Sequence, residues 1–339
     1  MQQETATILG AWVDHLVVVR GLSEASVSRY ERHVGRLLEG VDDPATLDGG
    51  DLDRYLKRLY HLGRGRPTLR LAVTAARSFG QFLVYRGLAE RTPFGAVIGP
   101  RGYRREAPAL SVSEVRRLIY GPHPGRLPVE PLSARNRVVL AVMYGLGLRR
   151  GEVGPLRVDN LKIEESSGCW AVLVRGAKWS DHDSRLWIEE PLINRLVGAY
   201  LAGPRQELVA KDPECPWLFP STRPVVKGGA KRRPLSAWAV GDIVKRGVEE
   251  AGIEARGRRL SSHILRHSVA THLLQGGAGE SVVQQFLRHA DPRSTRVYLH
   301  PGERGVRKMW KRARPLRQGG RAAGHRTGVE LLEELRRRE

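Results

Sequence analysis

Apolar positions recur at helical spacing through the first hundred residues. After Ser23, which has the residue type of an N-cap, apolar side chains return every three or four positions at Val27, Tyr30, Val34, Leu37 and Leu38. Residues 52–59 and 71–83 repeat this spacing, and Gly87 ends the last stretch. Because a period of 3.6 places such residues on one helix face, the pattern predicts an all-helical first domain over residues 1–100.

The periodicity stops at residues 101–110, which we predict to be a linker. Proline and glycine in and beside this segment favour an extended, solvent-exposed chain. Its arginines suit a position near a phosphate backbone. We therefore predict DNA contacts for Arg101, Arg104 and Arg105.

A second domain is predicted over residues 111–310. It opens with a capping box, in which Ser111 and Glu114 cap the same helix start. An apolar helix follows over residues 138–146. The rest of the domain has helical character, apart from one predicted hairpin.

The hairpin is indicated by two short runs of strand-forming residues, 169–175 and 185–188. The polar residues 176–184 form a turn-rich connection between them. The predicted fold class is therefore mainly α with a small β-hairpin or sheet. Residues 311–339 follow as a basic C-terminal tail.

The charge of the chain narrows the class of partner. Lys and Arg number 57 against 36 Asp and Glu, so the formal net charge is +21. Such an excess favours a polyanion, and nucleic acid is the first candidate.

The two cysteines, Cys169 and Cys215, form no CxxC pair, which argues against a disulfide scaffold or a zinc ribbon. With neither a signal peptide nor an apolar run of about 20 residues, we expect a cytoplasmic protein without a membrane partner.

Four short clusters carry the residue types that metal-free cleavage of a DNA strand requires. Two arginines hold the nonbridging phosphate oxygens, histidines donate or exchange protons, a lysine protonates the leaving 5′-oxygen, and a tyrosine attacks. We expect no metal and no cofactor, because this catalysis rests on positioning and electrostatic stabilisation. The candidates are Arg149 and Arg266 for the phosphate, His263 and His289 as donors, Lys178 for the leaving oxygen and Tyr298 as nucleophile.

The order and spacing of these residues resemble the tyrosine recombinase, or phage integrase, family. LRRGEVGPLRVDNL is similar to its first arginine box, and SSHILRHSVATHLLQGGAGESVVQQFLRHADPRSTRVYLH to its His-x-x-Arg, Gly-His and tyrosine boxes. RGLSEASVSRYERHVGRLL looks like the first helix of its core-binding domain. The resemblance covers nearly the whole chain and is strongest to Xer-like and integrase members. It implies a helical core-binding domain followed by an α+β tyrosine recombinase catalytic domain.

The same resemblance implies a site-specific recombinase that acts on double-stranded DNA. It would clamp a specific recombination site and exchange strands through a 3′-phosphotyrosine and a Holliday junction as a homotetramer, with accessory proteins as further candidate partners. The extra loop and the tail favour integration or excision of a mobile element over Xer-like dimer resolution. Two alternatives stay open, a type IB topoisomerase and a catalytically inactive DNA-binding protein.

The chain departs from the family pattern within the site. The hairpin reads GAK where Gly-Lys-Gly is usual, so Lys178 and the alternative proton donor His182 both stay candidates. Arg288 stands where a small glycine is usual, and we expect it to change local packing or to add a phosphate contact. Glu152 is expected to be a buried partner that orients its neighbours.

Two further segments differ from minimal family members. Residues 221–236, STRPVVKGGAKRRPLS, form a longer loop that either contacts DNA or is a solvated turn. Its candidate DNA contacts are Lys227, Lys231, Arg232 and Arg233. The C-terminal tail either docks on a neighbouring protomer, as in related recombinases, or is disordered. A helix that is normally regular is expected to be weakened by Gly151, Gly154 and Pro155.

Overall fold

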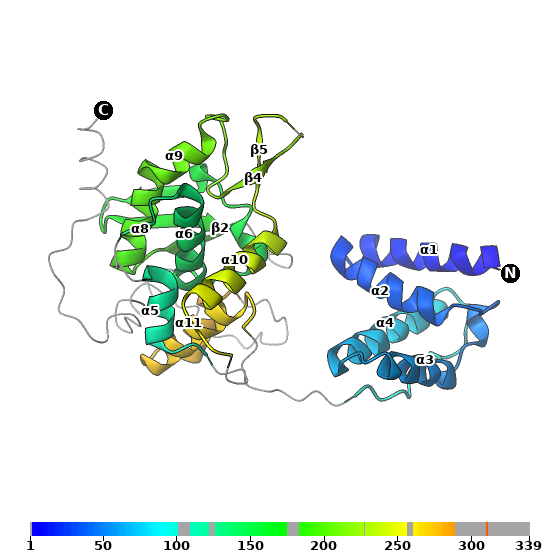
Figure 1. Cartoon of the computed structure of the whole chain (residues 1–339). Helices are drawn as coiled ribbons and strands as arrows, with labels where there is room; N and C mark the ends of the chain where they lie inside the picture. Colours follow the sequence, from blue (N-terminus) through cyan, green and yellow to red (C-terminus); the bar gives the residue numbers. More distant parts are fainter. Residues whose placement is uncertain are drawn as a thin grey trace. The chain divides into compact units, whose positions relative to one another are not determined.

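The computed structural model describes residues 2–100, 109–121, 126–174, 183–226, 228–255, 260–288 and Trp310. Contacts divide the chain into two compact units, Met1–Glu106 and Ala107–Glu339. Each unit has a hydrophobic core of its own. Figure 1 shows the helices and strands of both units. Within the described ranges, every helix is too short or too polar to span a membrane.

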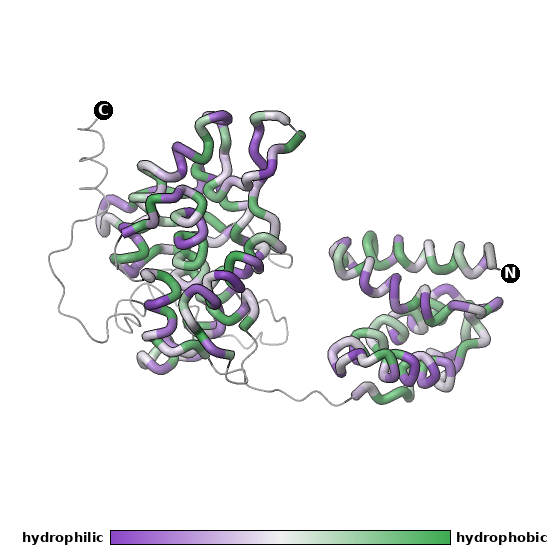
Figure 2. The backbone as a smooth tube through the Cα atoms, viewed as in Figure 1, coloured by the Kyte–Doolittle hydropathy of each residue, from purple (hydrophilic) through white to green (hydrophobic). Residues whose placement is uncertain are grey.

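The N-terminal unit is helical throughout its described part, as its apolar spacing predicts. Ser23 caps the second helix, because its side chain accepts a hydrogen bond from the Ser26 N–H at 3.3 Å. Trp12 and Phe79 are fully buried with their rings edge to face, 5.4 Å between centroids. Figure 2 shows hydrophobic and hydrophilic residues alternating along these helices. The elements are α1 (Gln2–Val18), α2 (Glu24–Leu37), η1 (Pro44–Thr46), α3 (Gly49–His61) and α4 (Arg66–Tyr85).

The C-terminal unit is built around α6 (Pro131–Gly145), which is buried at every position from Val138 to its end. A helix that is apolar on all sides needs packing partners on all sides. Figure 1 shows α6 in the middle of this unit. The helices in contact with it include α5 (Val112–Tyr120), α7 (Arg150–Val153), α8 (Pro191–Ala202), α9 (Pro204–Val209), α10 (Ala237–Glu250) and α11 (Ile264–Gln275).

Two small antiparallel sheets complete the described part of this unit. One has the order β1-β2-β3, with β1 (Leu161–Glu164), β2 (Cys169–Val174) and β3 (Ser184–Trp187), and the other pairs β4 (Pro220–Pro224) with β5 (Arg232–Pro234). The predicted hairpin is confirmed as β2 and β3, which pair through Val172 and Leu186. The prediction that the rest of the domain is helical was wrong, because β1, β4 and β5 are strands as well. The segments of β4 and β5 are rich in proline and arginine, so they lack the apolar alternation that identifies a strand.

Candidate active site

Three segments that are distant in sequence meet beside the end of α6: the turn before α7, the start of α11 and the turn after α12 (Glu280–Phe286). Gly147 makes the first turn possible, because its φ of 57° is a conformation that glycine adopts far more readily than residues with a side chain. A Cβ on Gly147 would lie 2.9 Å from Leu287 Cδ2 and 3.0 Å from Phe286 Cε1. The first turn therefore packs directly on the end of α12.

Arg266, in the first turn of α11, ties the other two segments together. Its side chain is buried, with 6 % of the residue exposed. One terminal nitrogen donates to the carbonyl of Gly147 and the other donates to the carbonyl of Leu287. Burial, reinforced by the positive charges of Arg149 and Arg288, lowers the pKa of Arg266 to about 9. The guanidinium therefore keeps its charge at neutral pH.

Arg149 is held by a carboxylate and still reaches the surface. Its Nη1 lies 2.9 Å from Glu152 Oε1, and its main-chain N–H donates to Glu152 Oε2 at 2.7 Å. Its Nη2 donates to the Arg288 carbonyl at 3.3 Å. The Arg149 side chain is 33 % exposed, whereas that of Glu152 is 8 % exposed. Glu152 is therefore buried and bonds both the main chain and the side chain of Arg149, and its role as the group that orients its neighbours stays a prediction.

Glu152 also binds Arg288, which sequence reasoning identified only as a departure from the family pattern. Arg288 Nη2 lies 2.8 Å from Glu152 Oε2. Burial pushes the pKa of Glu152 upward, but Arg288 and the hydrogen bonds from Arg149 outweigh it, and the net shift is downward. The carboxylate is therefore ionised at neutral pH. The only sequence signal for this contact was an arginine in the place of a small residue.

His263 stands at the N-cap of α11 and is exposed, whereas Arg266 on the same first turn is buried. The sequence predicts a shared helix face for these two residues. In the structure they belong to the same helix start but differ in exposure, because Arg266 is drawn into contacts with two main-chain carbonyls. His263 remains exposed at the surface.

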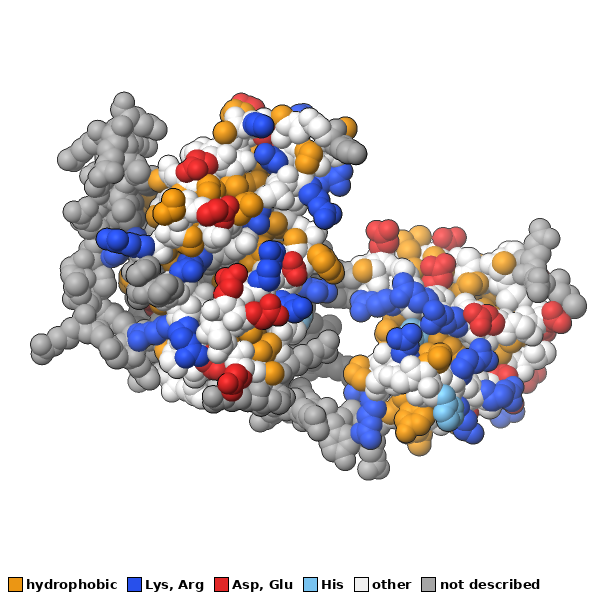
Figure 3. Space-filling view, viewed as in Figure 1, with side chains coloured by type: hydrophobic (Ala, Val, Ile, Leu, Met, Phe, Trp, Pro, Cys, Tyr) orange, Lys and Arg blue, Asp and Glu red, His pale blue; other side chains and the backbone are white. Residues whose placement is uncertain are grey.

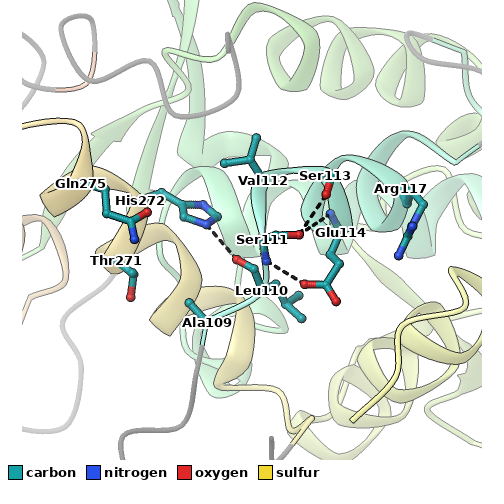
Figure 4. Close-up of a pocket in the computed structure, with 10 residues that line it drawn as sticks. All are labelled: Ala109, Leu110, Ser111, Val112, Ser113, Glu114, Arg117, Thr271, His272 and Gln275. Atoms are coloured by element: carbon teal, nitrogen blue, oxygen red, sulfur yellow. Dashed lines mark hydrogen bonds between the residues drawn. The ribbon is translucent and has the colours of Figure 1, made fainter. Parts of the chain in front are cut away.

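Buried polar contacts fix the helix that carries Arg266. His272 Nε2 donates to the Leu110 carbonyl at 2.8 Å, so its Nδ1 accepts from the Tyr144 hydroxyl at 2.9 Å. The Leu110 N–H donates to Ser268 Oγ at 2.9 Å. Burial, partly opposed by the bond to Leu110, lowers the pKa of His272 and favours the neutral ring that these bonds require. Figure 4 shows His272 reaching Leu110 at the pocket between α11 and the start of α5.

Much of the predicted catalytic set lies outside the described residues. These positions stay predictions: Lys178, with its alternative His182, and His289 and Tyr298. The same holds for the candidate DNA contacts Arg101, Arg104, Arg105 and Lys227. Within the described ranges, no group of three or more His, Cys, Asp and Glu side chains could hold a metal ion.

Comparison with known proteins places this site in a family. The phage integrase family model matches residues 109–304, and the model of the N-terminal SAM-like domain of phage integrases matches residues 9–87. Tyrosine recombinase XerD of Mycobacterium tuberculosis is 32% identical over 319 residues, which cover 91% of this chain and 97% of that protein. The chain belongs to the phage integrase family of tyrosine recombinases. Members of this family are enzymes that break and rejoin DNA.

Solved structures show that the recombinase also has the family's fold. A lambda integrase dimer bound to a COC′ core site matches with a TM-score of 0.62 at 14% identity, covering 94% of this chain and 98% of that one. A lambda integrase tetramer bound to a Holliday junction matches with a TM-score of 0.61 at 15% identity, covering 89% and 78%. At these identities the likeness concerns the fold alone.

The basic loop of the recombinase is a hairpin in the structure, formed by β4 and β5. Arg232 Nη1 donates to the Thr222 carbonyl at 2.8 Å, and Arg233 Nη2 donates to the Val225 carbonyl. Both arginines therefore stabilise the hairpin itself, while Lys231 is exposed beside them. Figure 3 shows Lys and Arg side chains gathered near this hairpin.

Proposed function

We propose that this recombinase cleaves and rejoins DNA at a specific site, with Tyr298 as the nucleophile that forms a 3′-phosphotyrosine. The observation that carries the proposal is the arginine cluster, in which Arg149 is fixed by Glu152 and is still 33 % exposed close to Arg266. Two guanidinium groups at one place can bind both nonbridging oxygens of a phosphodiester. Tyr298 lies ten residues after Arg288, a member of this cluster, in the chain.

The proposed step is an in-line displacement at phosphorus. The Tyr298 oxygen forms a bond to phosphorus, and the bond from phosphorus to the DNA 5′-oxygen breaks. The phenol proton passes to a histidine or to water, and Lys178 donates a proton to the leaving 5′-oxygen. Arg149 and Arg266 stabilise the charge on the nonbridging oxygens, and Arg266 keeps spare N–H donors because each terminal nitrogen carries two. A 5′-hydroxyl then reverses the step on a new strand.

Burial of the other tyrosines supports Tyr298 as the nucleophile. The described tyrosines of the C-terminal unit are Tyr120, Tyr144 and Tyr200, and each is at most 3% exposed. Burial raises the pKa of all three hydroxyls, which disfavours the phenolate that attacks phosphorus. All three phenols also belong to the hydrophobic core of the unit, which a DNA backbone does not enter. Tyr298 is the remaining tyrosine of this unit.

We propose double-stranded DNA with a specific recombination site as the partner, bound by a homotetramer that passes through a Holliday junction. The lambda integrase structures of like fold, a dimer on a core site and a tetramer on a junction, support this assembly. Lys231 and the neighbouring arginines of β5 are proposed as DNA contacts, because they place positive charge on one exposed hairpin. The relation to XerD supports an Xer-like role in dimer resolution. The hairpin of β4 and β5 supports, to the same degree, a role in integration or excision of a mobile element.

The test is trapping of the covalent intermediate on a suicide substrate that carries a nick beside the cleavage site. Wild type should form a protein–DNA adduct, and Tyr298→Phe should form none while binding the same DNA with unchanged affinity. Tyr120→Phe is the matched control, because the Tyr120 hydroxyl is buried and makes no hydrogen bond with the described residues. Equal adduct yields from Tyr298→Phe and wild type would refute the assignment. Relaxation of plasmids that lack any defined site would favour a topoisomerase instead.

A further inference from the structure

Arg288 has a backbone conformation that its side chain opposes. Its φ is 53°, and among the described residues it is the one non-glycine position with a positive φ. The left-handed region is unfavourable for a residue with a Cβ. Such strain persists only where the surrounding contacts over-determine it. The contacts of the Arg288 side chain therefore hold this conformation in place.

The Arg288 guanidinium is largely buried and bonds to residues of three elements. Its side chain is 10% exposed, and its Nη2 lies 2.8 Å from Glu152 Oε2. Its Nη1 donates to the carbonyls of Leu146 and Phe286 at 3.4 and 3.3 Å. One side chain thus joins the end of α6, α7 and the end of α12.

The main chain of the same turn is held by the two arginines of the site. Arg149 Nη2 donates to the Arg288 carbonyl at 3.3 Å, and Arg266 donates to the Leu287 carbonyl. The three arginines and Glu152 form one connected network around residues 287 and 288. The next residue along the chain is His289, so this turn sets the point from which the segment to Tyr298 departs.

Arg288 doubles the net positive charge of this network, from one to two, and so strengthens its attraction for an anion. Glu152 binds Arg149 through one oxygen and Arg288 through the other. With Arg149, Arg266 and Arg288 against one carboxylate, the network carries two net positive charges. Without Arg288, Glu152 would offset half of the charge of the remaining pair of arginines. Attraction for a phosphodiester would then fall, and more so because the network is partly buried.

We propose that Arg288 is a positioning residue, which binds Glu152 so that Arg149 is oriented toward a DNA phosphate while its charge is not cancelled. Arg288 acts through Glu152 and Arg149 and has no contact with the phosphate itself. The inference rests on the proposed cleavage function and adds to it the group that sets the charge of the phosphate site.

The test compares single-turnover cleavage of the suicide substrate with the affinity for the uncleaved site. Arg288→Gln should slow cleavage by about tenfold to a hundredfold, as displaced catalytic groups do, while the Kd for DNA changes little. Arg288→Lys should recover most of the rate, because it restores the positive charge beside Glu152. In a Glu152→Gln background, Arg288→Gln should cause little further loss, because no carboxylate is left to neutralise.

The control is Arg157→Gln, which breaks an arginine–aspartate pair of 2.9 Å with Asp159 on the surface of the same unit. It should change neither the cleavage rate nor the Kd. Thermal unfolding of each variant shows whether it is folded, and Arg288→Gly, which suits the left-handed φ, replaces Arg288→Gln if that variant is not. Wild-type cleavage by folded Arg288→Gln or Arg288→Gly, or an equal loss in both Glu152 backgrounds, would overturn the inference. Absence of an adduct from wild type would refute the proposed function itself, and the two failures are thus distinguishable.

Discussion

The close approach of α7 to the segment before α10 gives a sharp test of the architecture around Arg149. Gly154 caps the end of α7 with φ −59° and ψ −47°, which any residue can adopt, so alanine there is not strained by its backbone. Its Cβ, however, would lie 2.0 Å from the Leu235 carbonyl oxygen and 3.2 Å from the carbonyl carbon. Two main-chain segments must therefore separate by more than about 1 Å, since ordinary contacts between carbon and oxygen are about 3.3 Å or longer.

Gly154→Ala should therefore destabilise the C-terminal unit by about 3 kcal/mol, the upper range for overpacking a core. Gly151→Ala is the matched control on the same short helix, because a Cβ there meets nothing within 4 Å. It should be neutral or stabilising by about 0.4–1 kcal/mol, since alanine reduces the entropy of the unfolded chain.

Urea unfolding followed by circular dichroism measures both variants, and Gly154→Ala should also lower the Tm by roughly 6–12 °C. Cleavage should fall with it, because α7 carries Glu152 and has Arg149 as its N-cap. Equal stabilities of the two alanine variants would refute the close approach.

Three further predictions concern the site and the charge of the surface. Arg288→Gly should be about 1 kcal/mol more stable than Arg288→Ala, because both lose the ion pair and only glycine relieves the strain at φ 53°; equal free energies of unfolding would contradict that conformation. The pKa of Glu152 is lowered on folding, so its stabilisation is present above the unfolded pKa of about 4.3 and is lost as pH falls through the folded pKa. The stability difference between wild type and Glu152→Gln should therefore shrink at acid pH, and a difference that is constant down to pH 2 would refute the ion-pair account. DNA affinity should fall steeply with salt, with a log–log slope of about −0.9 for each phosphate neutralised, and Lys231→Gln combined with Arg233→Gln should reduce the slope by about two units; an unchanged slope would remove β5 from the DNA interface.

The sequence predicts the parts of this protein whose signals are local. Helix periodicity identifies α2, α3 and α4, and the capping box at Ser111 and Glu114 is present as expected at the start of α5. The strands β4 and β5 could not be found in this way, because their pairing depends on a partner strand and on arginine contacts within the hairpin.

The sequence likewise predicts several members of the site but not the contacts between them. Arg149, Glu152 and Arg266 were identified from motifs, but their mutual contacts depend on residues far apart in the chain. Arg266 binds a carbonyl 119 positions away, and Arg288 binds a carboxylate 136 positions away. No local pattern predicts such contacts. The single sign of the contact between Arg288 and Glu152 was an arginine at a position where the family usually has glycine.

The identity of the residue that becomes joined to DNA tests the central claim most directly. Wild-type protein would be trapped on a suicide substrate, digested with nuclease and trypsin, and examined by mass spectrometry. The account predicts a nucleotide joined through its 3′-phosphate to Tyr298, on the tryptic peptide VYLHPGER, residues 297–304. The same peptide recovered only in unmodified form, with the DNA attached to another residue, would contradict it.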